Sequence, residues 1–392
     1  MAQLLKEAAQ RAIDDRLAGL VHLSHAIHAH PELAFEEEQA CTWTAELLAD
    51  AGFAVTRGTA GMPTAFSAEA GSGPMVVAVC AEYDALPGVG HACGHNIIAG
   101  SAAAAGLGLA RVADDLGITV RVLGSPAEEG GGGKITMLEE GVFDGVHAAM
   151  MIHPWPVDRL EGTCLAVSHF DVTFTGKGAH ASAAPFEGVN AGDAMILAQV
   201  AIGLLRQQLR PGDQVHGVVT DGGQAANIIP DSTTGRFMCR STSMTGLVEL
   251  EPRVMACFDA GAVATGCRLE RADLAPVYSH MESDRGLLDL YRVNAEALGR
   301  RFDADDDGSP RPTFSTDMAN VSLAVPTIHP LVAIDAAGSV NHQPEFAAAC
   351  ITESADAALR DGGLAMAWTA IDAASDGPLR QRLLAGRPGP AL

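Results

Sequence analysis

Two short segments of the sequence combine residue types that bind metal ions or move protons. The first is Cys93-Gly-His95, which lies on a glycine-flanked loop after an apolar run. A thiolate and an imidazole two residues apart can turn toward one point and bind zinc or a related metal. The same pair also fits a nucleophilic cysteine with its histidine, or a turn without function, and the segment alone does not decide between these readings.

The second segment is Glu128-Glu129, which follows another apolar run and precedes a stretch of glycines. Adjacent carboxylates point in different directions, so one can bind a metal while its neighbour carries a proton. Taken alone, such a pair is more often a solvated acidic turn. Its place after a predicted strand, like that of Cys93 and His95, favours the functional interpretation.

Two further histidines fit the same arrangement, although a single histidine is more often structural than a ligand. His153 follows a short apolar run, and His342 lies near the C-terminal end. The combined set of sulfur, nitrogen and oxygen donors is larger than one tetrahedral zinc requires, and it suits two metals that share a bridging ligand. The candidate ligands are Cys93, His95, Glu129, His153 and His342.

The elements that must position these residues are two apolar runs with a helical segment between them. Met75–Ala81 has no polar alternation, as expected of a strand covered on both faces. Val120–Leu123 is the second strand, and Ile97–Asp114 is long enough for the connecting helix. This order predicts an α/β domain with a parallel, helix-covered sheet. Such a sheet binds ligands at the carboxyl ends of its strands, which is where both segments leave it.

The middle third of the chain has a different order of elements, β-α-β-β-α-β, which is typical of a ferredoxin-like α+β sandwich. We therefore predict a catalytic domain formed by residues 1–165 and 278–392, with a second domain inserted at residues 166–277. The expected strands are Asp171–Thr175, Val215–Thr220, Thr233–Arg240 and Arg268–Leu274, and the expected helices are Ala191–Leu209 and Leu247–Ala262.

Composition excludes several classes of protein. The 392 residues are 48% hydrophobic and 19% charged, which is too apolar for a disordered chain. The net charge of −23 argues against nucleic acid and against an anionic membrane surface as partners. The N-terminus does not resemble a signal peptide, and eight irregularly spaced cysteines do not make a disulfide framework. We therefore expect a cytoplasmic protein.

Four segments, in order along the chain, resemble the M20 metallopeptidase and aminoacylase family. The resemblance covers essentially the whole chain. A cysteine in the metal loop is typical of the branch with auxin-conjugate and N-acyl-amino-acid hydrolases, while residues 315–322, with Tyr83 and Asn96, are closer to aminobenzoyl-glutamate hydrolase and related dipeptidase-like amidohydrolases. The segments are Glu82–Asn96, Pro126–Gly130, Gly176–Ala181 and Gln224–Asp231.

The resemblance implies a di-metal peptidase-type fold and a role for each candidate residue. The five candidate ligands match the residues that hold two divalent metal ions in the family, with Cys93 as the bridge. Glu128 matches the general base that takes a proton from water, and Asp84 matches a carboxylate that orients a ligand from behind. Thiolate ligation favours zinc, although manganese, cobalt or nickel also fit.

The inserted domain is implied to serve as a lid and as the contact of a homodimer. His180 matches a histidine that reaches the partner's active site and stabilises the oxyanion. Asn227 and Arg240 match substrate-binding positions, with the arginine gripping a carboxylate. From the residues alone, His180 could cap a loop and Arg240 could pair with any surface acid.

The expected function is metal-dependent cleavage of the amide bond in an N-acyl or aminobenzoyl amino acid or a small dipeptide with a free carboxylate. A simple aminoacylase or dipeptidase of the same family is the nearest alternative. A catalytically inactive ligand-binding relative is a second, but it would lack Glu128 or a metal ligand. His28, His30 and His91 are not expected to bind metal.

Overall fold

The computed structural model describes residues 1–302 and 312–386, which form two compact units. Unit 1 comprises Met1–Thr163 and the chain from Met281 onward, and unit 2 comprises Cys164–His280. These limits differ by two or three residues from the division made on the sequence. The difference arises because Tyr278 and Val167 exchange two backbone hydrogen bonds, of 2.9 and 3.1 Å, which hold the exit of unit 2 against its entry.

Unit 1 is built on a six-stranded sheet in the order β1-β2-β4-β3-β5-β15. Strands β4, β3, β5 and β15 are parallel to one another, as predicted. Strands β1 and β2 add an antiparallel edge, which was not predicted. The strands are β1 (Ala54–Arg57), β2 (Phe66–Gly71), β3 (Met75–Glu82), β4 (Ile118–Ser125), β5 (Ala148–Met150) and β15 (Thr327–Ile328).

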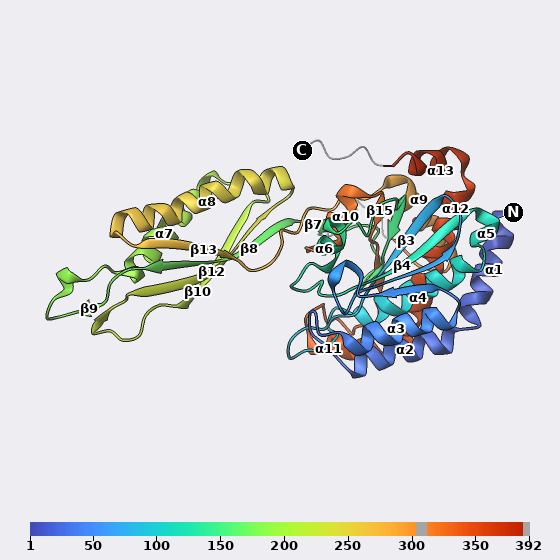
Figure 1. Ribbon diagram of the computed structural model, residues 1–392, viewed down its shortest axis with the longest axis horizontal. Coiled ribbons are helices and arrows are strands. Elements are labelled where there is room, and N and C mark those ends of the chain that lie inside the picture. Colours follow the sequence, from blue (N-terminus) through green and yellow to red (C-terminus); the bar gives the residue numbers. More distant parts are fainter. Residues whose placement is uncertain (303–311, 387–392) are drawn as a thin grey trace. The chain divides into compact units, whose positions relative to one another are not determined.

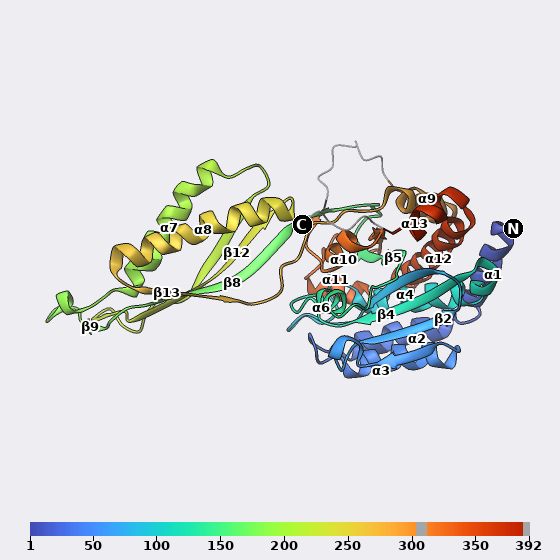
Figure 2. The ribbon, with the colours of Figure 1, turned by 45° about the horizontal axis from the view of Figure 1, so that its top comes forward.

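Strand β3 is covered on both faces, which explains its unbroken apolar sequence. Val77 and Val79 belong to the larger core, while Ala78 and Cys80 belong to a smaller core on the opposite face. The views in Figures 1 and 2 show helices on both sides of the sheet. The larger core is formed with α1 (Ala2–Asp14), α2 (Leu17–Ala29), α3 (Glu38–Asp50), α4 (His95–Ala110), α9 (Arg285–Ala297) and α12 (Glu353–Ser375), and the smaller with α6 (Gly133–Glu139) and α10 (Met318–Ala324).

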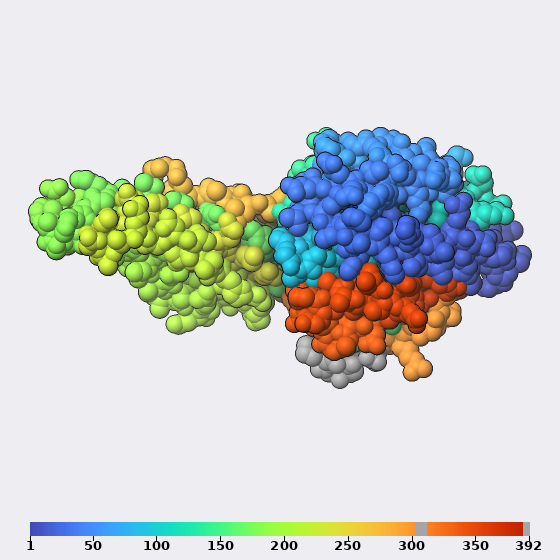
Figure 3. All heavy atoms as spheres, turned by 90° about the horizontal axis from the view of Figure 1, so that it is seen from below, coloured from blue at the N-terminus to red at the C-terminus, as the bar shows by residue number. Residues whose placement is uncertain are grey.

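Helix α4 connects β3 to the parallel strand β4 and is buried on all sides. Glycines on its surface allow close packing, since a Cβ at Gly100 would lie 2.3 Å from a methyl carbon of Leu359 on α12. The N-terminal helices and the C-terminal helix α12 therefore pack together around α4, and Figure 3 shows the blue N-terminal segment lying against the red C-terminal segment. The remaining elements of unit 1 are η1 (Thr59–Gly61), α5 (Ala113–Leu116), β6 (His153–Trp155), β14 (Thr313–Phe314), β16 (Leu331–Ala333), α11 (Pro344–Ala349) and α13 (Gly377–Leu384).

Unit 2 has the β-α-β-β-α-β order predicted from the sequence. Its four strands are all antiparallel, in the order β10-β12-β8-β13, and two helices cover one face (Figure 1). The core between helices and sheet contains a cluster of phenylalanines. The elements are β8 (Ala166–Thr175), α7 (Ala191–Leu205), β10 (Gln214–Asp221), β12 (Ser232–Ser241), α8 (Met244–Thr265) and β13 (Arg268–Asp273), with the short segments β7 (Thr163–Cys164), β9 (Ala179–His180), η2 (Pro185–Glu187), η3 (Arg206–Gln208) and β11 (Ile228–Ile229).

Within residues 1–302 and 312–386, the structure has no helix that combines the length and the apolar surface needed to cross a lipid bilayer.

Candidate metal centre

The loops that follow β3, β4 and β5 meet at the carboxyl edge of the unit 1 sheet. His95 is the first residue of α4, Glu128 and Glu129 follow β4, and His153 opens β6 directly after β5. Close approach of these loops requires glycine at position 94. Gly94 has a φ of 74°, and a Cβ there would lie 2.8 Å from the Cγ atom of Pro154.

The donor atoms of the candidate ligands form two groups that share Cys93. One group is Cys93, His95 and His153, and the other is Cys93, Glu129 and His342. Within each group the ligand atoms lie within 4.8 Å of one another. Because the thiol belongs to both groups, the arrangement suits two cations bridged by one thiolate.

Two hydrogen bonds fix the orientation of the buried imidazoles. Asp84 Oδ1 lies 3.0 Å from Nδ1 of His95, and the carbonyl oxygen of Pro154 lies 2.8 Å from Nδ1 of His153. Each contact uses Nδ1 and leaves Nε2 free to bind a cation. Asp84 also accepts the backbone N–H of Glu129 through its other oxygen, at 3.0 Å, so one carboxylate holds two of the loops that carry candidate ligands.

Several buried carboxylates lie close together at this edge, which favours the binding of cations. Burial, the carboxylate of Glu82 and that of Glu129 raise the pKa of Glu128 well above its ordinary value. Burial opposes a charge on His95, but Asp84 outweighs it and raises the pKa of that imidazole well above its usual range. Nε2 of His95 and Oε1 of Glu129 are buried and have no hydrogen-bond partner among the described residues. Two divalent cations would satisfy these atoms and offset the crowded carboxylates, so the residues present fit such a centre.

His342 reaches the same edge from the C-terminal third of the chain. Its side chain is 63% exposed, and Nε2 lies 3.8 Å from Oε2 of Glu129. Its backbone N–H donates to the carbonyl of Ala92 at 2.9 Å, which attaches this loop directly to the loop of Cys93. The neighbouring Asn341 donates to the carbonyl of Pro154 at 3.3 Å. The main chain therefore places His342 although its side chain is open to solvent.

Three buried charged residues next to the centre were not assigned a role from the sequence. The ammonium group of Lys134 donates to Glu82 and, at 2.8 Å, to Asp317. Carboxylate oxygens of Glu82, Asp317 and Glu128 lie within 4.8 Å of one another. The lysine thus balances carboxylates directly behind Glu128. Two features of the sequence could have indicated these residues. Lys134 lies in an apolar and glycine-rich segment, and Glu82 ends a buried strand.

The histidines that were not expected to bind metal stand outside both donor groups. Helix α2 ends at Ala29, as the proline at position 31 predicts. His28 contacts the carbonyl of Ala347 through Nε2 at 2.8 Å. His91 is buried, and burial lowers its pKa to about 3.

The candidate residues of unit 2 lie at opposite ends of its sheet. His180 is opposite Ile228 in the short β9–β11 ribbon, and the N–H of Ala181 donates to the carbonyl of Asn227 at 3.0 Å. His180 and Asn227 are therefore neighbours, and both are exposed. The imidazole of His180 uses Nδ1 in contacts with its own turn, of 3.2–3.3 Å, which leaves Nε2 free.

Arg240 lies near the other end of β12, opposite Val167 of β8 and close to the chain's exit from unit 2. Its guanidinium is half-buried and lies 3.8 Å from the sulfur of Met238. No carboxylate pairs with it in the part of the chain that the structure describes. An arginine held in this way can donate hydrogen bonds to the carboxylate of a ligand.

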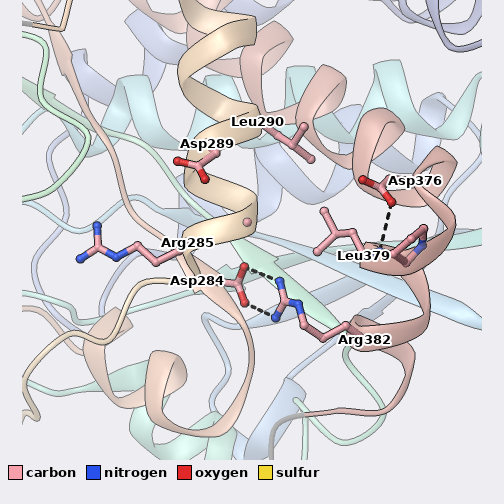
Figure 4. Close-up of a pocket in the computed structure, with 9 residues that line it drawn as sticks. Asp284, Arg285, Asp289, Leu290, Asp376, Leu379 and Arg382 are labelled. Carbon is pink, nitrogen blue, oxygen red and sulfur yellow. Dashed lines mark hydrogen bonds and ion pairs between the residues drawn. The ribbon is translucent and has the colours of Figure 1, made fainter.

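A separate open pocket of about 570 Å³ lies between α9 and α13 (Figure 4). Its main charged groups already bind one another, because Arg382 contacts both carboxylate oxygens of Asp284, at 2.6 and 2.8 Å. Asp376 is occupied in capping α13. We assign no function to this pocket.

Comparisons with known proteins show the family to which the chain belongs. Residues 78–360 match the model of Peptidase family M20/M25/M40. The chain is 38% identical to Xaa-Arg dipeptidase of Mus musculus, over 94% of this chain and 89% of that protein. It is 33% identical to one of the subunits of p-aminobenzoyl-glutamate hydrolase from Escherichia coli, over 67% and 60%. A dinuclear metal-binding peptidase of the M20 family from Bacillus subtilis has the same fold, with a TM-score of 0.71 and 21% identity, over 92% of this chain and 99% of that chain.

The family match covers most of the chain, including every loop that reaches the carboxyl edge, and it confirms the resemblance found in the sequence motifs. The chain therefore belongs to the peptidase family M20/M25/M40 and is an enzyme that acts on amide or peptide bonds.

Proposed function

We propose that this protein is a two-metal hydrolase that cleaves the amide bond of a small dipeptide or an N-acyl amino acid. The observation that carries the proposal is the pair of donor groups sharing Cys93, with the carboxylate of Glu128 beside them. Cys93, His95 and His153 would hold one cation, and Cys93, Glu129 and His342 the other. When bound, two divalent cations polarise the scissile carbonyl and lower the pKa of a water molecule.

Glu128 is proposed to move the proton. Its carboxylate takes a proton from the attacking water and then gives it to the nitrogen of the leaving amine. The side chain is buried and its carboxylate lies beside those of Glu82 and Glu129, so the transferred proton is shielded from bulk solvent. Lys134 balances the charge behind it without contacting the substrate position.

Zinc is the metal we propose for this site. A cysteine thiolate is a soft ligand, and imidazole suits zinc equally well. Manganese, cobalt and nickel are compatible with the same set of donors, and the cell's supply of metals influences which one is bound. The proposed compartment is a reducing cytoplasm, where the Cys93 thiol is preserved.

The proposed substrate carries a free carboxylate, which Arg240 would bind. Relatives of 38% and 36% identity are named Xaa-Arg dipeptidases, so dipeptides with a C-terminal arginine or lysine are the first candidates. A relative of 33% identity is named for p-aminobenzoyl-glutamate, which makes aromatic amides of glutamate the second candidates. Both types offer a carboxylate next to the scissile amide.

We further propose a homodimer formed through unit 2. Ile196, Leu197, Val200 and Leu204 form an exposed apolar stripe on α7, with exposed fractions of 43–61%. Strand β10 is the neighbouring sheet edge, and among the described residues it pairs only with β12. An exposed apolar stripe and a sheet edge whose outer side has no neighbouring strand are typical of a surface that another chain covers. In such a dimer, the partner's His180 would stabilise the oxyanion at the active site.

A panel of amides tests the proposed activity. Release of the amine would be followed for Xaa-Arg dipeptides, β-alanyl-lysine, p-aminobenzoyl-glutamate and N-acetyl amino acids. Dialysed protein would be assayed with Zn²⁺, with Mn²⁺ and with EDTA. Cleavage that the metal restores and EDTA abolishes supports the proposal. Cleavage that EDTA does not change contradicts the metal mechanism, and no cleavage by protein with two bound metals contradicts the substrate class.

The proposed dimer requires its own measurement. The variant Val200→Asp places a charge in the middle of the α7 stripe, and Asp193→Asn changes a charge at the exposed start of the same helix as a control. Light scattering after gel filtration should show a dimer for the wild type and for the control and a monomer for Val200→Asp. A monomeric wild type contradicts the proposal.

A further inference from the structure

The backbone turn that carries Glu128 and Glu129 is closed by two hydrogen bonds to one residue, Ala127. The carbonyl of Ala127 accepts the N–H groups of Gly131 and Gly132, at 2.9 and 2.8 Å, so the turn folds back onto it. Ala127 is fully buried and has a φ of 58°, in the left-handed region that residues other than glycine rarely adopt. A side chain elsewhere in the fold must therefore keep this residue in place.

That side chain is Glu37, which lies far away in the sequence at the start of α3. Its Oε1 atom accepts the N–H of Ala127 at 2.8 Å and the N–H of Phe35 at 2.9 Å. Phe35 also has a left-handed backbone, with a φ of 65°. One buried carboxylate oxygen thus holds two unfavourable backbone conformations, one in the N-terminal segment and one in the catalytic turn.

The segment around Glu37 has two further connections to the metal-bearing loops. The ring of Phe35 lies over the backbone of Gly131, where a Cβ would come within 2.4 Å of it. The carbonyl of Glu32 accepts the N–H of Ala85, next to Asp84, at 2.8 Å. Residues 32–37 therefore contact both the loop after β3 and the turn after β4.

The two catalytic carboxylates are held by different groups. The N–H of Glu129 is bound by Asp84, which also orients His95. The N–H of Ala127, immediately before Glu128, is bound by Glu37. Loss of Glu37 would therefore leave the Glu129 contact intact and release the side of the turn that leads into Glu128.

We propose that Glu37 is a positioning residue that fixes the backbone of Ala127 and thereby the direction of the Glu128 carboxylate. This inference rests on the proposed function of Glu128. Glu37 does not belong to either donor group. Its contribution is to hold the general base in the geometry needed for proton transfer, where a misplacement of about 1 Å costs about 10²-fold in rate.

The test compares Glu37→Ala with Glu37→Gln, and uses Glu36→Ala, at an exposed neighbouring position, as the matched control. The glutamine oxygen can still accept both N–H groups, so Glu37→Gln should keep nearly wild-type activity. Glu37→Ala should lower kcat by about 10²-fold while KM and a content of two metals per chain stay unchanged. Should Glu37→Ala fail to fold, Glu37→Asp, which is one methylene shorter and cannot reach both groups, should show the same selective loss.

Hydrogen exchange in the metal-free protein provides a readout that does not depend on activity. Amides in residues 125–132 should exchange faster in Glu37→Ala than in Glu37→Gln or the wild type. Unchanged exchange, loss of metal together with the rate, or an equal loss of kcat in Glu37→Gln would overturn the proposal. A wild type that cleaves no amide refutes the proposed function, whereas the exchange experiment still decides whether Glu37 holds the turn.

Discussion

The candidate residues of the two units are held in different ways. In unit 1, hydrogen bonds hold the imidazoles of His95 and His153 and the backbone N–H of Glu129 before any ligand binds. In unit 2, the imidazole of His180 contacts its own turn, and the guanidinium of Arg240 contacts the sulfur of a residue on its own strand. The unit 1 residues are therefore held in place by the fold itself, whereas the proposed roles of the unit 2 side chains depend on a substrate or a partner. Changes in unit 1 should abolish chemistry, and changes in unit 2 should alter its rate or affinity.

The largest effect is expected from Cys93→Ala, because Cys93 belongs to both donor groups. This variant should lose most of both metals and all measurable activity. His342→Ala removes a ligand of one group only, so it should lose about one metal per chain. Metal analysis after dialysis measures both, with His147→Ala, a histidine outside the centre, as the control. Equal metal loss in the two ligand variants would contradict the bridging role.

Glu128→Gln should lower kcat by about 10²–10⁴-fold with two metals still bound. The amide keeps the shape of the side chain but cannot take a proton from water. Steady-state kinetics and metal analysis on the same sample separate the two effects. Glu139→Gln, an exposed residue of α6, is the matched control. A loss of metal that parallels the loss of rate would identify Glu128 as a ligand instead of a base.

His180→Ala should lower kcat by about 10²-fold or more, because a donor to the developing oxyanion is lost. The dimer proposal makes this effect depend on the partner. Mixing His180→Ala with Glu128→Gln chains should restore about a quarter of the wild-type rate, since half of the dimers are mixed and each has one complete site. No recovery in mixed dimers would show that His180 acts within its own chain.

Arg240→Ala should raise KM by about 10- to 10²-fold, the loss expected for a charged hydrogen bond, with a smaller change in kcat. Arg236→Ala is the matched control, since Arg236 lies on the same strand and pairs with Asp171 on the surface, at 2.9 Å. A substrate analogue without the carboxylate should bind the wild type and Arg240→Ala equally. A change in kcat alone would contradict a role in binding.

The last expected effect concerns stability and leaves the chemistry unchanged. Burial, with the charge of Asp84 adding to it, raises the pKa of Glu37 from 4.5 to about 7. The folded protein therefore binds this proton more tightly than the unfolded chain does. The stabilisation is present below pH 4.5 and is lost as the pH rises to about 7, by up to about 3 kcal/mol.

Denaturant unfolding at pH 5 and pH 8 measures this loss. Glu37→Gln, which does not titrate, should reduce the difference between the two pH values, and Glu36→Gln at the exposed neighbouring position should not. An unchanged difference in Glu37→Gln would show that other groups cause the pH dependence.

Much of the fold of both units could be predicted from the sequence. The unbroken apolar run of β3 and the order of elements in unit 2 follow directly from hydrophobic patterns, and both are present in the structure. The loops of Cys93 and Glu128 could be placed on one edge because parallel strands end on the same side of a sheet. These inferences rest on local patterns and on topology alone.

The supporting residues could not be predicted in this way, because their roles depend on contacts between distant segments. Nothing near Glu37 in the sequence distinguishes it from Glu36 or Glu38, and only its distance from the N–H of Ala127 does. Similarly, Lys134 and Asp317 are far apart in the chain, and their ion pair is visible only in the folded protein. The antiparallel edge formed by β1 and β2 depends on pairing that short, mixed sequences do not specify.

The position of unit 2 within the sequence has a consequence for biosynthesis. The chain leaves unit 1 after β7 and returns only at Met281, and both β15 and His342 follow that return. On the ribosome, four of the five candidate ligands emerge before unit 2 is made, and the fifth emerges near the end of translation. Cys93, His95 and His153 are therefore synthesised early, but the second candidate group, and helix α12 that packs against α4, are complete only after the C-terminal third has been synthesised. Insertion of unit 2 thus delays the completed enzyme until its own proposed dimerisation surface has already been produced.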